Sequence, residues 1–263
     1  MTPNLSRRHA VLSLGGLDLS TMLPMGGTTQ AADIATSGWP VKPITYVVPF
    51  TPGGSTDVIG RTLVQKLTDI LGQPVIVDNK PGAAGAVGAT FAAKAKADGY
   101  TLFGGTISTH AINASLYKGL PYDPVKDFEP VVLVATLPNV LIASPTLGVN
   151  SVAELVTLLK KDPSKRYFAS SGSGTSTHLA GEMFADLIGV PLTHVPYKGT
   201  PPAMLDVSSG QVPFMFDQMT AAVSLAQAGK LKLLAVTTPK RMALAPTLPT
   251  MMESGIKNFQ MAS

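Results

Sequence analysis

Two turns rich in glycine and hydroxyl side chains have the residue types needed to hold a small anion. The first runs from Pro49 to Asp57 and the second from Ser170 to His178. Each follows an apolar segment that predicts a strand and precedes a segment that predicts a helix. The first N–H groups of a helix have no partner inside the helix, and glycine lets a ligand come close to the backbone. Both turns therefore predict an anion site.

A third turn, at residues 197–200, precedes Pro201 and carries the same chemistry, with Lys198 as a cation. In α/β sheets, ligands bind beyond the carboxyl ends of the strands, which is where all three turns are expected. Helix capping alone would account for any single turn. Three such turns in one chain favour a binding site.

Four further side chains have two interpretations each. Asp57 caps its helix or accepts a hydrogen bond from a polar ligand group. Asp217 follows an apolar strand, so it accepts from a ligand ammonium or hydroxyl group, or caps the next helix. His110 and His178 either line a cleft or are satisfied structural residues.

Several classes of site are excluded by their missing motifs. The sequence has no P-loop, no G-x-S-x-G and no H-E-x-x-H, and G-x-G-x-x-G spacing fails at both glycine-rich turns. It has no cysteine, and its histidines lack the spacing of metal ligands. A net charge of +4, from 20 basic and 16 acidic residues, is too diffuse to predict nucleic-acid binding. We expect no cofactor and no metal; a Rossmann-type, nucleotide-dependent enzyme is the alternative.

Strand and helix patterns alternate from Lys42 onward, which predicts an α/β fold with parallel sheets. Because two series each begin with a glycine-rich turn, we expect two lobes. Residues 33–138 would form lobe 1 and residues 139–237 lobe 2, with residues 238–263 returning to lobe 1. The apolar bands Val131 to Ala135 and Val140 to Ala143 predict strands buried on both faces. Predicted helices span Thr56 to Leu71, Ala84 to Ala97, Ser151 to Lys161, Ser176 to Ile188, a segment opened by Pro201-Pro202, and Thr220 to Ala228.

The first 32 residues predict a signal peptide of the Sec or Tat type. Arg7 and Arg8 provide a positive head, residues 10–23 are mostly apolar, and Ala31-Ala32 offers a cleavage site. The mature protein is then expected in the periplasm. No apolar run after this segment reaches the length of a membrane-spanning helix.

Several stretches together resemble the Bug family, the substrate-binding proteins of tripartite tricarboxylate transporters. The matching stretches include PFTPGGSTD at 49–57, GQPVIVDNKPGAAGAVG at 72–88, SSGSGTSTHLAG at 170–181 and HVPYKGTPP at 194–202. The resemblance spans about Trp39 to Ser263. It implies a type II periplasmic binding protein, in which two Rossmann-like lobes joined by a hinge close on a ligand in the cleft between them.

The resemblance also implies what is bound and by which residues. The ligand would be a small carboxylate (a di- or tricarboxylate, an amino acid or an aromatic acid), and the partners would be the membrane components of a transporter. With His178 from the motif analysis, the predicted ligand-binding residues are Phe50, Gly53, Gly54, Ser55, Thr56, Asp57, Thr106, Ser108, His110, Ser170, Ser171, Gly172, Gly174, Thr175, His178, Tyr197, Lys198, Gly199 and Asp217.

The resemblance leaves three alternatives to a transport receptor. Members of the family normally continue beyond the stretch that ends at Ser263, so we expect a shortened copy with an incomplete first lobe. Such a copy would be a receptor or a non-functional fragment. A soluble sensor that reports ligand to a sensor-kinase partner is a further alternative, and a Rossmann-type enzyme is the last. In each case we expect a monomer.

Overall fold

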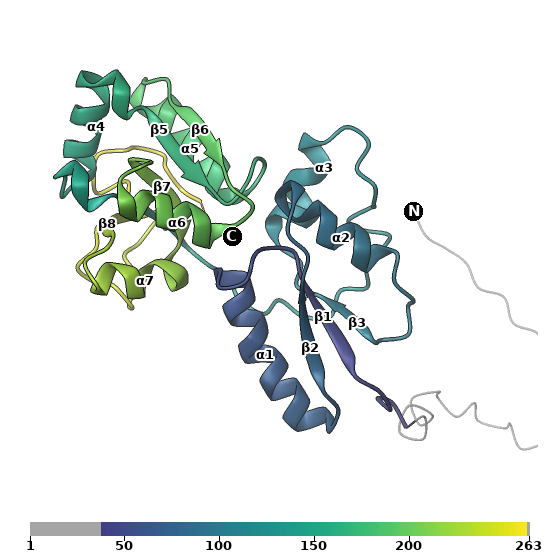
Figure 1. Ribbon diagram of the computed structural model, residues 1–263. Helices are drawn as coiled ribbons and strands as arrows, with labels where there is room; N and C mark the ends of the chain where they lie inside the picture. The colour runs from purple at the N-terminus through teal and green to yellow at the C-terminus, as the bar shows by residue number, and fades with distance from the viewer. Residues whose placement is uncertain (1–37, 262–263) are drawn as a thin grey trace, which may run out of the picture. The chain divides into compact units, whose positions relative to one another are not determined.

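The computed structural model describes residues 38–261, and the predicted signal peptide lies outside them. Within the described residues, strands and helices alternate in two sheets, which confirms the α/β class (Figure 1). The contacts of residues Pro40–Ser263 make them one unit. None of the helices described between residues 38 and 261 is long and apolar enough to cross a membrane.

The first sheet contains three parallel strands in the order β2-β1-β3. The strands are β1 (Ile44–Val48), β2 (Val75–Asn79) and β3 (Thr101–Phe103). Helix α1 (Ser55–Leu71) packs on β1 and β2, and α2 (Ala86–Ala93) packs on β1 and β3 (Figure 1). Helix α1 ends as predicted, because Gly72 takes the left-handed conformation, with φ 64°, that caps a helix.

The second sheet contains five strands in the order β6-β5-β7-β4-β8. Its strands are β4 (Asn139–Ala143), β5 (Tyr167–Ser170), β6 (Thr193–Pro196), β7 (Phe214–Gln218) and β8 (Lys232–Val236). Strands β5, β6 and β7 are parallel, as predicted, whereas β4 is antiparallel to β7 and β8. The connection from β7 to β8 spans β4, which lies between them in the opposite direction. The prediction of wholly parallel sheets was therefore wrong for β4.

Helices cover both faces of the second sheet. Helices α4 (Val152–Lys161) and α5 (Ser176–Ile188) pack on one face, and α6 (Thr200–Ser209) and α7 (Met219–Gln227) on the other. All five residues of β4 are buried for this reason, as the apolar band Val140 to Ala143 predicted. The predicted cap of α4 is confirmed, since Ser151 Oγ accepts from the Glu154 N–H at 3.2 Å.

Short helical segments complete the described chain. One of them, η2, occupies the start of the helix predicted at 84–97. The observed helix α2 is therefore shorter than predicted. The short segments are η2 (Ala83–Gly85), the π-helical η3 (Ser108–Ile112), α3 (Asn113–Leu116), η4 (Pro145–Leu147) and η5 (Pro163–Lys165).

Two sequence predictions disagree with the packing. No strand of the described residues includes Val131 to Ala135, and the Val131 side chain is 84% exposed. Apolar composition alone does not make a strand when no neighbouring strand pairs with it. Residues 238–261 do not join the first sheet either. Met251 and Phe259 are fully buried in the core of the second sheet, and Thr250 pairs with Val236 of β8.

Candidate ligand-binding site

A cavity of about 230 Å³ lies at the carboxyl ends of β1, β2, β5 and β6. Its position agrees with the expectation that ligands of α/β proteins bind beyond the carboxyl ends of the strands. The wall combines small residues, three aromatic rings, two serines and one cation. It is formed by Phe50, Gly82, Ala83, Ala84, Gly85, Tyr117, Ser171, Gly172, Ser173, Pro196, Tyr197 and Lys198.

Five of the predicted ligand-binding residues line this cavity: Phe50, Ser171, Gly172, Tyr197 and Lys198. The turn at 82–85 was not predicted as part of the site, although it lies within the GQPVIVDNKPGAAGAVG stretch, because alanine and glycine there indicate the beginning of a helix. Tyr117 was not predicted either, since it lies in a segment without a recognisable motif.

The turn at 82–85 has an unusual backbone. Ala83 and Ala84 have φ values of 46° and 51°, a region that alanine rarely adopts. Asn113 stabilises the turn by donating from Nδ2 to the Ala84 carbonyl at 3.2 Å. Gly85 permits close packing, because a Cβ there would lie 2.7 Å from Thr109 Cγ2. Helix α2 begins directly after this turn, so its positive dipole end is at the cavity.

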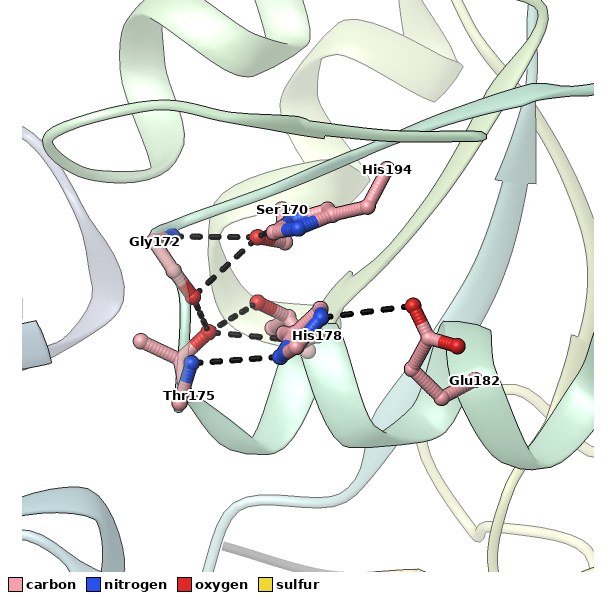
Figure 2. Close-up of polar contacts among 8 residues, drawn as sticks. Ser170, Gly172, Thr175, His178, Glu182 and His194 are labelled. Atoms are coloured by element: carbon pink, nitrogen blue, oxygen red, sulfur yellow. Dashed lines mark hydrogen bonds and ion pairs between the residues drawn. The ribbon is translucent and has the colours of Figure 1, made fainter. Parts of the chain in front are cut away.

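The second glycine-rich turn is held by its own hydroxyl groups. Ser170 Oγ accepts from the Gly172 N–H at 3.1 Å, and Thr175 Oγ1 donates to the Gly172 carbonyl at 2.7 Å (Figure 2). Thr177 Oγ1 accepts from the Ser171 N–H at 3.0 Å. Ser170 and Thr175 therefore shape the loop from behind and do not line the cavity.

Two stacked histidines contact residues of this turn. Their ring centroids are 3.9 Å apart. His194 Nε2 lies 2.6 Å from Ser170 Oγ, and His178 Nδ1 accepts from the Gly174 N–H at 3.1 Å (Figure 2). His178 Nε2 then carries the proton and faces Glu182 Oε1 at 3.3 Å. Burial, followed by the neighbouring His178 ring, lowers the pKa of His194 to about 4.

The two tyrosines of the cavity wall are both anchored by their hydroxyl groups. Tyr197 Oη donates to Asp206 Oδ2 at 2.5 Å, and Tyr117 Oη donates to the Ser173 carbonyl at 3.0 Å. Burial and then Asp206 raise the pKa of Tyr197 to about 12, so its hydroxyl stays protonated. Both rings are thereby fixed in the cavity wall.

The exposed Lys198 also lines the cavity. It takes part in none of the ion pairs found between residues 38 and 261.

The first glycine-rich turn contributes Phe50 to the cavity and otherwise packs against other residues. A Cβ on Gly53 or Gly54 would lie 3.6–3.8 Å from Pro201, and Ser55 Oγ accepts from Thr220 Oγ1 at 2.7 Å. Thr56 occupies the first turn of α1.

Asp57 lies in the first turn of α1 and bonds to neighbouring protein groups. Its Oδ2 accepts from the Gly53 N–H and from Arg61 Nε, both at 2.9 Å, and its Oδ1 accepts from Asn79. These bonds hold the pKa of Asp57 below its usual value although burial acts in the opposite direction.

The remaining predicted residues lie away from the cavity wall. Thr106 and Ser108 belong to the segment around η3, where His110 packs against Phe103 and Phe128. Gly199 is buried against Thr51; a Cβ there would lie 2.1 Å from Thr51 Oγ1.

Asp217 is fully buried. Its Oδ1 accepts from the Gln218 N–H at 2.8 Å and from Thr200 Oγ1 at 3.1 Å, whereas Oδ2 has no partner. Burial raises the pKa of Asp217 to about 7. This carboxyl therefore bonds within the protein and does not face the cavity.

Residues 59–263 match the sequence model of a protein family, the tripartite tricarboxylate transporter family receptor. The chain belongs to this family. The UPF0065 protein of the tcbD-tcbE intergenic region of Pseudomonas sp. (strain P51) is 38% identical over 258 residues, which are 98% of this chain and 74% of that relative.

Two solved structures of similar proteins share the fold. The periplasmic binding protein BugD is 40% identical with a TM-score of 0.80, and an R. palustris protein solved with adipate is 39% identical with a TM-score of 0.83. Each match covers 85% of this chain and 75% of the other. The expected fold of a Bug-type periplasmic binding protein is confirmed.

Proposed function

We propose that this chain is a periplasmic solute-binding receptor that holds a small carboxylate in the cavity at the ends of β1, β2, β5 and β6 and delivers it to a tripartite tricarboxylate-type transporter. The observation that supports it is a wall with unused hydrogen-bond donors, one cation and no carboxylate. Membership of the receptor family and the adipate found with one similar protein agree with it.

The donors come from two separate turns. Among the hydrogen bonds of residues 38–261, none uses the N–H of Ala84 or of Ser173, and both residues line the cavity. Ser173 Oγ and Lys198 Nζ add further donors. A hydrogen bond to a charged group contributes about 1.5–3 kcal/mol. Several such bonds, set against the cost of association, are compatible with binding near micromolar, or about −8 kcal/mol.

We further propose that the site binds its ligand without catalysing a reaction. Ser170 and His194 have the distance of a nucleophile and its base, 2.6 Å. However, the Ser170 side chain is fully buried, and its hydroxyl already bonds to both backbone groups of Gly172. A nucleophile must reach its substrate, and this serine does not line the cavity.

The nucleotide alternative is disfavoured by the packing around the start of α1. A pyrophosphate would need open space over this helix end. Gly54 and Ser55 are buried instead, with Thr200, Pro201 and Thr220 as neighbours. A nucleotide-dependent enzyme would therefore need a different site.

Isothermal titration calorimetry of the purified chain against di-, tri- and monocarboxylic acids tests the proposal. We expect micromolar binding of at least one acid and none of NAD. Lys198→Gln should weaken that binding about tenfold, because it removes the cation of the wall. The matched control is Lys66→Gln, which changes an exposed lysine of α1. Equal binding by both variants, or no binding by the parent chain, would contradict the proposal.

The cellular context is tested separately. We propose a monomer in the periplasm that meets the membrane components of the transporter. Fractionation of cells expressing residues 1–263 should place the protein in the periplasm, and gel filtration should give one chain. Capture of a sensor kinase rather than transporter subunits from crosslinked membranes would favour the sensor role.

A further inference from the structure

The charge of the cavity wall discriminates between classes of carboxylate. Lys198 is the one formally charged residue of the wall, and the wall contains neither aspartate nor glutamate. An amino acid carries an ammonium group beside its carboxylate. We propose that the cavity selects carboxylates that lack an ammonium group, such as dicarboxylates and aromatic acids, over the corresponding amino acids. This inference rests on the proposed function.

Acidic side chains that approach the neighbourhood of the cavity are already engaged elsewhere. Asp57 is paired with Arg61, and Asp206 accepts from Tyr197 Oη. Asp217, which the sequence analysis considered as a partner for a ligand ammonium group, is fully buried behind Thr200. An ammonium group inside the cavity would therefore find no carboxylate to balance its charge.

Several backbone carbonyls of the wall are already engaged. Three of them already accept hydrogen bonds from the protein: Gly172 from Thr175 Oγ1, Ser173 from Tyr117 Oη and Ala84 from Asn113 Nδ2. A fourth, that of Gly82, accepts from the N–H of Gly85 at 2.9 Å. These four carbonyls are engaged, whereas the N–H groups of Ala84 and Ser173 are unused, which favours a carboxylate over an ammonium group.

The aromatic rings of the wall strengthen the same preference. Phe50, Tyr117 and Tyr197 provide apolar surface for a hydrocarbon chain or ring between carboxylates. A cation over a ring face is attracted to it by about 0.5–2 kcal/mol. A buried ammonium group without its hydrogen-bond partners loses more than this. The ring faces therefore do not replace the missing carboxylate.

Calorimetry with matched pairs tests the inference, using the full chain. The pairs are succinate and L-aspartate, glutarate and L-glutamate, and 3-phenylpropanoate and L-phenylalanine, since the members of each differ only in the ammonium group. We expect the acid to bind at least about tenfold more tightly than the amino acid in each pair that binds, a difference of about 1.4 kcal/mol. Equal or tighter binding of the amino acid would overturn the inference and leave the proposed function standing. Binding of none would overturn both.

A charge-reversed wall provides the second test. Lys198→Glu places a carboxylate at the cavity. It should lower the ratio of the affinity for the acid to the affinity for the amino acid at least fivefold. The matched control, Lys66→Glu, should leave the ratio of the two affinities unchanged. A ratio in Lys198→Glu equal to that of the parent chain would show that the charge of the wall does not set the selectivity.

Discussion

The buried carboxyl of Asp217 should make the stability of the protein depend on pH in a defined direction. Its ordinary pKa is 3.8, and burial raises it to about 7 in the folded chain. The folded state therefore holds a proton that the unfolded state releases between these two values. Stability from this group is complete below pH 3.8 and is lost as the pH rises to about 7.

The size of the effect follows from the same two values. A tenfold change in a proton-binding constant corresponds to about 1.4 kcal/mol, so the loss amounts to about 4 kcal/mol above pH 7. Asp217→Asn has no proton to lose. Its free energy of unfolding, relative to that of the parent chain, should rise by about 4 kcal/mol between pH 4 and pH 7.5, with most of the rise below pH 7.

Urea unfolding followed by far-ultraviolet circular dichroism at several pH values measures this difference. The asparagine amide places a donor where Oδ2 has no partner, which costs about 1–3 kcal/mol at every pH. The change with pH, rather than the absolute difference, is therefore the decisive quantity. Asp69→Asn, at an exposed position of α1, controls for the loss of one charge. A difference that stays flat from pH 4 to 7.5 would refute the account of Asp217 as a dry, unpaired carboxyl.

Three further outcomes are expected. Tyr117→Phe removes the hydrogen bond to the Ser173 carbonyl and should weaken carboxylate binding, measured by calorimetry, about fivefold. The control Tyr167→Phe, which changes an exposed tyrosine, should leave binding unchanged. Because the pKa of His194 is lowered from 6.5 to about 4, the parent chain should lose melting temperature relative to His194→Gln as the pH falls from 6.5 to 4, and equal slopes would contradict this. Gly181→Ala should destabilise by about 1–3 kcal/mol in urea, since its Cβ would lie 2.0 Å from Phe168; an unchanged midpoint would show that the ring moves freely.

The periodic parts of the fold were predictable because they depend on local signals. Helix α5 occurs as predicted at Ser176–Ile188, and α1 differs from its prediction by one residue. The prediction of a strand at Val131 to Ala135 was wrong because a strand needs a neighbouring strand to pair with, and composition does not reveal one. The direction of β4 was missed for the same reason. Pairing is a property of the assembled sheet, whereas caps and apolar stripes belong to a single segment.

The candidate site was predictable only in part, because the motif analysis could not separate residues that face the cavity from residues that shape it. The turn at 170–178 drew attention through its hydroxyl groups. In the structure, Ser170, Thr175 and Thr177 use those hydroxyls inside the turn, on its own N–H and carbonyl groups. The donors left for a ligand come largely from backbone groups, including that of Ala84, which no side-chain motif marks.

This division of roles has a consequence for binding. A loop whose polar groups are hydrogen-bonded within the protein before the ligand binds has little conformational freedom to lose. A larger part of the free energy of each new hydrogen bond therefore contributes to the affinity. The stacked histidines extend the same support, because His194 contacts Ser170 and His178 accepts from Gly174. Substitutions in this supporting group should therefore weaken binding of every carboxylate to a similar degree. Lys198, on the cavity wall, should instead change which carboxylate is preferred.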